Sequence, residues 1–349
     1  MSQKNNRIIK LAVLVSLVFV AALYFTINKK IDELSKTYYY LGTVSEVKVF
    51  NAKKSNAEAA LKDADTILKD IHNKMSAQQS NTEINKINEK AGISPVTVSN
   101  ETFNVIEASI KYANLTGGVF DPTIGAISSL WQIGTNNARV PSSDEITRNL
   151  QLINYKNIEL DKSKKTVFLN EKNMRLDLGA IAKGYVADLI CENLTSNNIE
   201  SAIINLGGNV FVLGDKSGQP YKIGIQAPYE EASTSIGYIK AENTSVVTSG
   251  IYERFVKAGD KLYHHMLNPK TGYPFENNLN SVTIISKKSI DGDALSTSTF
   301  GMGLEKGLEF INSKKDVGAI FLTKDKKIYL SNSMKSRFIL TDESYKIVE

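Results

Sequence analysis

Apolar residues recur at two spacings along this chain, and the spacing changes near residue 157. Before that point the repeat is helical, as in residues 56–75, where Leu61, Leu68 and Ile71 share one stripe. Residues 102–115 repeat the pattern and stop at two glycines, and Ser143 marks the start of a further helix to about residue 152. The spacing Ser80 to Glu83 is that of a capping box, which predicts a short helix there.

From residue 157 onward, alternation of apolar and polar residues predicts strands instead. Two late helices, over 291–302 and 304–312, interrupt them. An earlier strand over 38–50, broken at Gly42, follows a polar spacer at 31–37. The sequence therefore predicts a mixed α+β (α/β) fold with long antiparallel stretches. Its expected later strands are 158–160, 166–169, 174–178, 202–205, 209–213, 221–225, 236–240, 245–248, 262–267, 282–286, 319–323, 328–331 and 337–340.

The N-terminal segment 11–28 carries no charge and is mostly apolar, so as a helix it is just long enough to cross a bilayer core. Lys4, Arg7 and Lys10 precede it, which favours a cytoplasmic N-terminus. We expect residues 1–30 to form a cytoplasmic tip and signal anchor, with residues 31–349 as one extracytoplasmic catalytic domain. A cleaved signal peptide, processed near Ala22, is the alternative, and it also places the body outside the cytoplasm.

Charge and cysteine content narrow the function classes. The chain holds 42 Lys and Arg against 37 Asp and Glu, and five of those cations lie in residues 1–30, which contain no acid. The remaining body is formally neutral, so charge gives no argument for a nucleic-acid partner. The single cysteine, Cys191, excludes an internal disulfide and cysteine-built zinc or iron–sulfur sites, and it lies too far from the leader to be its lipidated cysteine.

Residues 176–189, LDLGAIAKGYVADL, predict a strand end, a glycine turn and a helix start. Gly179 and Ala180 leave the backbone uncovered at the turn, and Lys183 lies in the first helical turn. Unpaired N–H groups and a lysine at a helix N-terminus are suited to holding an anion such as a phosphate. The alternative is an ordinary tight turn with a solvated lysine.

Two further signals are weak when taken singly. Asp293 and Thr297 are four residues apart on a predicted helix, so they share a face and offer hard oxygen ligands suited to Mg²⁺. The alternative is a helix-start carboxylate and a hydroxyl bonded to its own helix. His264 and His265 are adjacent on a predicted strand and point to opposite faces, which argues against a two-histidine metal centre but leaves room for one general base.

Taken together and in order, the motifs resemble those of the ApbE-type flavin transferases (FAD:protein FMN transferases). The resemblance covers roughly residues 40–312, nearly all of the body. One departure is Asn268, where the family usually has Asp; it should keep the turn but puts any role of that carboxylate in doubt. The matching segments are Met75-Ser76 with 81–88, 118–125 (GVFDPTIG), 177–184 (DLGAIAKG), 205–209 (NLGGN), 248–250 with 252–254, 265–274 and 293–297.

The resemblance implies specific roles and a fold of two T-fold-like halves. The carbonyl of Ala180, with Asp293 and Thr297, would hold Mg²⁺ against the FAD diphosphate, and His265 would be the base. The residues implied to contact FAD are Met75, Val119, Phe120, Asp121, Lys183 and Met266.

The expected activity is Mg²⁺-dependent transfer of FMN from FAD to a Ser or Thr hydroxyl of an acceptor flavoprotein, with release of AMP. Chemically this needs positive charge around a diphosphate, which Mg²⁺, a lysine and helix N–H groups supply. Two alternatives stay open. Water replacing the acceptor would make the protein a hydrolase that releases FMN and AMP, and a chain without catalysis would be a flavin-binding or delivery module.

Overall fold

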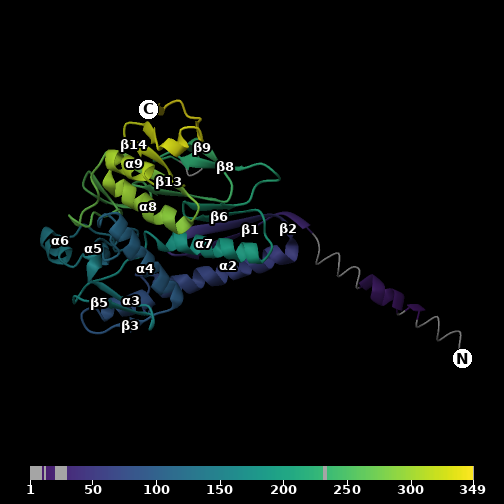
Figure 1. Ribbon diagram of the computed structural model, residues 1–349, viewed down its shortest axis with the longest axis horizontal. Helices are drawn as coiled ribbons and strands as arrows, with labels where there is room; N and C mark the ends of the chain where they lie inside the picture. Colours follow the sequence, from purple (N-terminus) through teal and green to yellow (C-terminus); the bar gives the residue numbers. More distant parts are fainter. Residues whose placement is uncertain (1–9, 12, 20–29, 231–233, 349) are drawn as a thin grey trace.

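The computed structural model describes residues 10–11, 13–19, 30–230 and 234–348, and a nine-stranded sheet organises the body (Figure 1). Neighbouring strands run antiparallel except β15 and β17, which are parallel. In spatial order the strands are β1 (Lys30–Tyr40), β2 (Thr43–Lys53), β6 (Ala202–Leu206), β7 (Asn209–Leu213), β10 (Thr244–Gly250), β13 (Leu279–Ser286), β14 (Gly318–Thr323), β15 (Lys327–Leu330) and β17 (Lys346–Val348).

Three smaller sheets accompany the large one. The hairpin of β11 (Phe255–Ala258) and β12 (Lys261–His264) stands alone as a two-stranded sheet. A three-stranded sheet has the order β16 (Phe338–Leu340), β9 (Ser235–Ala241), β8 (Tyr221–Gln226). Another has the order β3 (Val96–Thr97), β5 (Thr166–Leu169), β4 (Ile158–Asp161).

Helices pack on one face of the large sheet, where α2, α7 and α8 lie across its strands (Figure 1). These helices are α2 (Lys54–Met75), α7 (Ala182–Ser196), α8 (Ser289–Met302) and the shorter α9 (Leu304–Asn312). The other helical elements of the body are α3 (Glu83–Glu89), α4 (Asn100–Leu115), α5 (Gly125–Trp131), α6 (Ser143–Leu150) and the 3₁₀ turns η1 (Tyr155–Asn157) and η2 (Asn332–Met334).

The apolar side chains gather in three cores. The main core lies between the helices and the large sheet and contains the predicted stripe of α2 with strand residues such as Val47 and Val282. A second core fills the space between the other sheet face and the β8–β9–β16 sheet, with Val246 and Ile239 among its members. The third gathers around the fully buried Trp131 of α5. Each large side chain buried in this way contributes about 1.5–3 kcal/mol of transfer free energy.

The mixed α+β fold and the expected helices are confirmed, but residues 31–37 are not a spacer. They belong to β1, which pairs with β2 along nearly its whole length, from Lys30 opposite Lys53 to Tyr40 opposite Thr43. The segment looks polar because β1 is an edge strand whose side chains are mostly exposed. The division into two T-fold-like halves stays a prediction.

Residues 174–178 alternate correctly but form no strand. Met174, Leu176 and Leu178 are all buried, as expected. The backbone of Leu176 finds its partners in a side chain instead, because its N–H donates to Asn88 Oδ1 (2.7 Å) and its carbonyl accepts from Asn88 Nδ2 (3.2 Å). A buried asparagine therefore replaces the neighbouring strand, and only one isolated bridge, Ile124 to Arg175, remains.

Two predicted caps move by one or two residues. Helix α3 is capped by Thr82, whose hydroxyl accepts from Asn85 N, and not by Ser80. Glu83 therefore lies at the first helical position and accepts hydrogen bonds from Ser99 instead of closing a capping box. A complete capping box does form at α6, where the N-cap is Ser142 and not Ser143.

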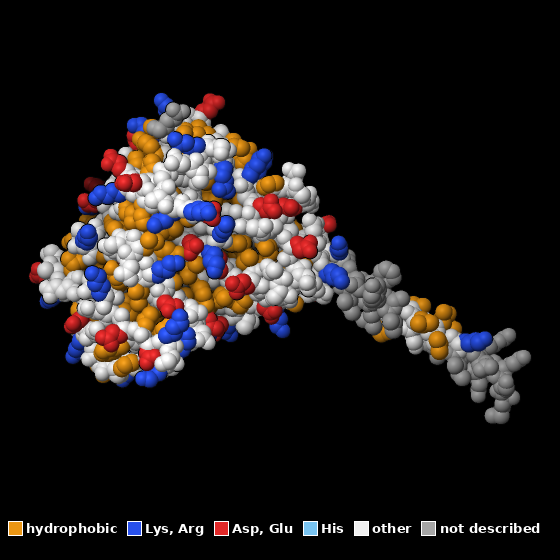
Figure 2. Space-filling view, viewed as in Figure 1, with side chains coloured by type: hydrophobic (Ala, Val, Ile, Leu, Met, Phe, Trp, Pro, Cys, Tyr) orange, Lys and Arg blue, Asp and Glu red, His pale blue; other side chains and the backbone are white. Residues whose placement is uncertain are grey.

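The predicted membrane segment 11–28 lies largely outside the described residues. Residues 10–11 and 13–19 are helical. Within the described part of the chain, no helix is both long enough and apolar enough to cross a membrane. On the visible face of the body, Lys and Arg side chains are interspersed with Asp and Glu (Figure 2), in keeping with the neutral charge balance.

Candidate active site at the start of helix α7

The side chain of Asp177 stabilises the glycine turn that precedes α7. This carboxylate accepts from the backbone N–H of Gly179 (2.9 Å) and from the hydroxyl of Ser128 (2.6 Å). The N-cap residue of α7, Ile181, has no side-chain cap. The first turn of the helix is therefore left to find hydrogen-bond acceptors outside α7.

Helices α7 and α8 approach each other closely at Gly184. A Cβ atom there would lie 2.7 Å from the Cα of Ile290 and would press against the carbonyl oxygen of Ser289. Asp188, one turn further along α7, accepts from the backbone N–H groups of Ser289 (2.7 Å) and Ile290 (3.0 Å) and so caps the start of α8. The absence of a side chain at Gly184 allows this contact.

In return, α8 caps the start of α7 through Asp293. This carboxylate is 4% exposed, and its Oδ2 accepts from the backbone N–H of Gly184 (2.9 Å). Its Oδ1 lies 3.4 Å from Lys183 Nζ, which also donates to the carbonyl of Gly179 (3.4 Å). Since the Gly184 N–H is taken by Asp293, no hydrogen bond reaches the carbonyl oxygen of Ala180 within the described residues.

A hydroxyl cluster adjoins Asp293 on α8. Thr297 Oγ1 lies 3.3 Å from Ser249 Oγ of β10, and the same Ser249 oxygen lies 2.8 Å from Ser296 Oγ. Ser296 in turn donates to the carbonyl of Asp293 (3.0 Å). Strand β10 therefore fixes the position of the Thr297 hydroxyl one turn from the carboxylate.

The two histidines have different surroundings, as their alternation predicts. The backbone N–H and the Nδ1 of His265 both lie within hydrogen-bond distance of the Arg254 carbonyl, at 3.1 and 3.2 Å. Because a carbonyl only accepts, Nδ1 carries the proton and Nε2 is left with a lone pair. Burial, with the positive charges of Arg254 and Lys183 as further contributions, lowers the pKa of His265 to about 3, so the ring is neutral at pH 7.

Two charged residues of the 252–254 segment belong to this cluster, although sequence reasoning assigned them no role. Glu253 is exposed at the surface, and desolvation by the surrounding chain raises its pKa above the usual value, while Lys183 and Arg254 oppose that shift and Asp293 adds to it. Arg254 donates to the carbonyl of Gly42 in the β1–β2 turn (2.8 Å). The motif order pointed to this segment, but nothing in its spacing marked Glu253 as a neighbour of Lys183.

Most of the residues expected to contact FAD face inward. The side chains of Met75, Phe120 and Met266 belong to the main core, and Val119 packs at its edge. The carboxylate of Asp121 is also occupied by donors of the protein. Its Oδ1 accepts from Thr123 N (2.8 Å) and Oγ1 (2.6 Å), and its Oδ2 accepts from Tyr155 N (3.1 Å). The structure thus gathers Lys183, Ala180, Asp293 and Thr297 around the start of α7. His265 is near enough for the charge of Lys183 to contribute to its lowered pKa. FAD contacts by the other residues stay predictions.

The turn that follows His265 keeps its shape with asparagine at position 268. Asn268 Oδ1 accepts from Lys270 N (2.9 Å), and the Asn268 carbonyl accepts from Gly272 N (2.8 Å). The turn is fastened to α5 because Trp131 Nε1 donates to the carbonyl of Gly272 (2.8 Å). A carboxylate is therefore not needed to form this turn.

The donor set at the start of α7 fits a hard cation. Within the described residues, no group of three or more His, Cys, Asp or Glu side chains could hold a metal. A site built from the Ala180 carbonyl, Asp293 and Thr297 supplies oxygen atoms only, with a single carboxylate. Mg²⁺ is typically held by one or two carboxylates, with substrate phosphates and water completing its shell, so the free Ala180 carbonyl beside Asp293 suits it.

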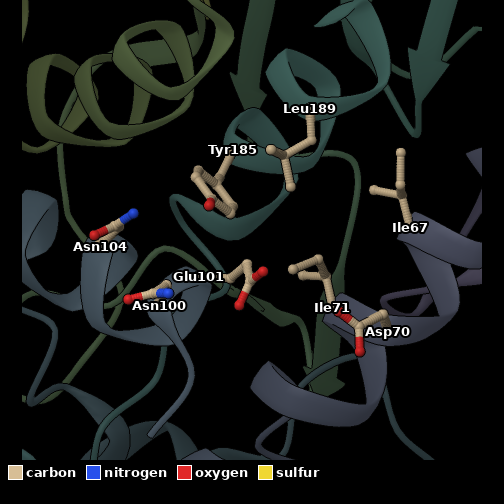
Figure 3. A pocket seen from close by; sticks show the side chains of 8 residues that line it. All are labelled: Ile67, Asp70, Ile71, Asn100, Glu101, Asn104, Tyr185 and Leu189. Atoms are coloured by element: carbon tan, nitrogen blue, oxygen red, sulfur yellow. The ribbon is translucent and has the colours of Figure 1, made fainter. Parts of the chain in front are cut away.

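A cavity of ≈ 300 Å³ lies away from this cluster, between α2, α4 and α7 (Figure 3). Ile67, Ile71 and Leu189 form its apolar wall, and Glu101 stands opposite them. Glu101 is engaged by Lys74, whose Nζ lies 3.3 Å from its carboxylate. None of the predicted site residues lines this cavity.

Comparison with known proteins identifies the family. The sequence profile of the ApbE family matches residues 41–321. The chain belongs to the ApbE family. Among similar proteins, the FAD:protein FMN transferase of Klebsiella pneumoniae (strain 342) is 36% identical over 315 residues, which covers 90% of this chain and 98% of the relative. That of Treponema pallidum (strain Nichols) is 32% identical over 331 residues, with 90% and 91% covered.

Solved structures of ApbE proteins share this fold. The crystal structure of the ApbE protein from Thermotoga maritima aligns with a TM-score of 0.81 at 32% identity, and the alignment covers 87% of this chain and 99% of that one. The flavin transferase ApbE from Vibrio cholerae aligns with a TM-score of 0.78 and covers 88% and 100%, and at 24% identity it supports the fold alone.

Proposed function

We propose that this ApbE-family chain transfers FMN from FAD to a Ser or Thr hydroxyl of an acceptor flavoprotein, with Mg²⁺ and with release of AMP. Relatives named FAD:protein FMN transferase align over nearly the whole chain. The observation that carries the proposal is the start of α7. There Asp293 takes the N–H of Gly184, which leaves the Ala180 carbonyl free beside a lysine and a carboxylate.

In this proposal the Ala180 carbonyl, Asp293 and Thr297 would hold Mg²⁺. When bound, the ion neutralises the non-bridging oxygens of the FAD diphosphate. Lys183 adds a second positive charge, because its ammonium projects from the first turn of α7 next to Asp293. The positive end of the α7 dipole also favours negative charge at the same place.

The reaction is a single displacement at phosphorus. The acceptor hydroxyl oxygen attacks the phosphorus on the FMN side of the diphosphate, and the bond from that phosphorus to the bridging oxygen breaks. AMP leaves with the bridging oxygen, while FMN becomes a phosphoester of the acceptor. The hydroxyl proton passes to Nε2 of His265, which is unprotonated because Nδ1–H is committed to the Arg254 carbonyl.

The surroundings of His265 suit a base that works only with substrate present. In the free protein, burial and nearby cations lower its pKa to about 3. A diphosphate bound at Lys183 brings negative charge that counters the lysine, so the proton affinity of Nε2 rises when FAD is in place. His265→Gln should therefore slow transfer at least 100-fold while FAD affinity, measured by flavin fluorescence, changes less than threefold.

The test uses the chain with FAD, Mg²⁺ and a purified flavoprotein domain whose acceptor Ser or Thr is unmodified. Mass spectrometry should show the acceptor gaining FMN less one water, and a chelator should prevent it. Asp293→Ala should abolish transfer, because it removes a ligand and leaves the Gly184 N–H without an acceptor. The control Asp291→Asn lies on the same helix but contacts Tyr112 instead, and it should retain transfer.

Two other results of this test would favour the alternative functions. Free FMN and AMP beside an unmodified acceptor would make the protein an FAD diphosphatase. Intact FAD in the presence of Mg²⁺, despite measurable binding, would leave a flavin-binding or delivery protein. Full transfer by Asp293→Ala would contradict the metal assignment.

We also propose that residues 11–28 anchor the chain in the membrane, with the body on the extracytoplasmic side. The described helical residues of this segment expose apolar side chains, among them Leu14 (58%), Val18 (62%) and Phe19 (67%). Exposed apolar surface of this kind favours contact with lipid or with another apolar partner. The full chain should sediment with membranes and a variant lacking residues 1–29 should not. Recovery of the uncleaved full chain in the soluble fraction would contradict the anchor.

A further inference from the structure

The outer edge of β12 carries backbone groups without partners. His265 N donates to Arg254 O, so in the β11–β12 ladder the alternate residues 261, 263 and 265 turn their backbone toward β11. Leu262 and His264 therefore turn their N–H and C=O groups away from β11. No hydrogen bond to these four groups is present within the described residues.

The segment around Phe275 pairs with the residues that follow β12, but not with β12 itself. Phe275 N donates to Met266 O (3.0 Å), and Leu267 forms a bridge with Pro274. Beyond Phe275 this segment no longer pairs with β12. A cavity of ≈ 310 Å³ opens there, lined by Leu262 and His264 on one side and by Phe275, Glu276 and Asn277 on the other.

The side chains around this cavity include an unpaired polar atom and exposed apolar surface, which another chain could contact. His264 Nε2 donates to the Phe275 carbonyl (3.0 Å), and its Nδ1 is buried without a hydrogen-bond partner. On the same face of the hairpin, Phe255 (45% exposed) and Leu262 (47%) present apolar surface to solvent. Besides the His264–Phe275 hydrogen bond, one ion pair, Lys261 to Glu276 (3.2 Å), joins the two sides. Such an exposed pair contributes at most about 1 kcal/mol, so an incoming chain can displace it.

We propose that the outer edge of β12 is the docking surface for the acceptor, which binds as an extended segment paired with Leu262 and His264. This inference rests on the proposed function. Pairing with a free strand edge needs no particular acceptor side chains beyond the apolar contacts at Phe255 and Leu262. The paired segment must leave the edge before Met266, where Phe275 is already bound, and His265 lies between these two points. The acceptor hydroxyl then follows directly after the paired residues.

The two edges of the hairpin provide a matched pair of variants. Leu262→Pro removes one outward N–H from the β12 edge, and it removes no bond to β11 because that N–H points away from the partner strand. Lys257→Pro makes the same change opposite Leu262, but on the outer edge of β11. With the unmodified acceptor domain described above, Leu262→Pro should raise the Michaelis constant for the acceptor about 3–10-fold. Lys257→Pro should leave it unchanged, and both variants should bind FAD normally.

A second measurement needs no variant. Hydrogen exchange of the amides of Leu262 and His264 should slow when the acceptor domain is added to the FAD-loaded chain, while that of Lys257 should not. This exchange measurement still tests the proposal if Leu262→Pro fails to fold. Loss of FAD binding by that variant would reveal such a failure.

The outcomes separate the two claims. If the unsubstituted chain transfers no FMN, the proposed function fails and the docking edge fails with it. If it transfers FMN but both proline variants behave alike and exchange at Leu262 and His264 is unchanged, the docking edge alone is wrong.

Discussion

Replacing Gly184 with alanine should damage both the fold and the site through one added methyl group. Its Cβ would lie 2.7 Å from Ile290 Cα, whereas ordinary contacts begin at 3.4 Å, so the two helices must separate by about 0.7 Å or more. The neighbour is backbone at the start of α8, which cannot rotate away as a side chain can. The separation also stretches the 2.9 Å bond from Gly184 N to Asp293.

The size of the effect follows from three contributions. Overpacking of this kind costs about 1–3 kcal/mol, and weakening a hydrogen bond to a charged group costs up to about 1.5–3 kcal/mol. Against these, alanine gains about 1 kcal/mol over glycine within a helix. The packing and hydrogen-bond losses outweigh the propensity gain, and we expect a net loss of about 2–4 kcal/mol in the free energy of unfolding. Misplacement of Asp293 should also lower FMN transfer about 100-fold.

Urea unfolding followed by circular dichroism measures the first effect, and mass spectrometry of the acceptor measures the second. The control is the pair Glu192→Ala and Glu192→Gly at an exposed position of α7, which gives the alanine–glycine difference of this helix without a steric neighbour. If Gly184→Ala were as stable as the unsubstituted chain and fully active, the close contact of α7 and α8 would not be what positions Asp293.

Three further predictions test other parts of the molecule. Burial raises the pKa of Asp188 from 3.8 to about 6, so the folded state binds this proton more tightly than the unfolded state does. The contribution of Asp188 to the free energy of unfolding therefore falls as pH rises from about 4 to 6. Asp188→Asn should flatten this pH dependence, measured by urea unfolding at a series of pH values. Trp131→Phe should cost about 2–3 kcal/mol in unfolding free energy by circular dichroism, because the Gly272 carbonyl loses its donor. The C–H resonances of His265, assigned with His265→Gln, should not titrate between pH 5 and 8 in the free protein. A midpoint near 6.5 would contradict its neutral state.

Sequence patterns located most elements but not the partners that stabilise them. The stripe of α2 could be read because helical spacing depends only on local positions. The backbone partner of Leu176 is a side chain 88 residues away, and the edge position of β1 depends on which strand lies next to it. Such long-range pairings leave no trace in local periodicity, so 174–178 resembled a strand and 31–37 resembled a spacer.

The same distinction between local spacing and long-range contacts applies to the candidate site. Lys183, Asp293 and Thr297 were identified by residue type and spacing with the help of motif order, and the structure brings them together. The reciprocal capping of α7 and α8 could not be foreseen, because it joins Gly184 to Asp293 across 109 residues. Glu253 was missed for the same reason, since its neighbours Lys183 and Asp293 are on other elements.

The nine-stranded sheet has a consequence for how much of the chain is needed to avoid aggregation. The family match covers 41–321, yet β1 lies on one side of the sheet and β15 and β17 on the other, all outside that range. A fragment trimmed to the matched residues would keep every proposed catalytic residue but would leave β2 and the remaining part of the buried β14, residues 318–321, as bare edges. Bare edges recruit other chains. The terminal strands β1, β15 and β17 therefore protect the sheet against self-association through its inner strands. Light scattering of such a fragment should show aggregates.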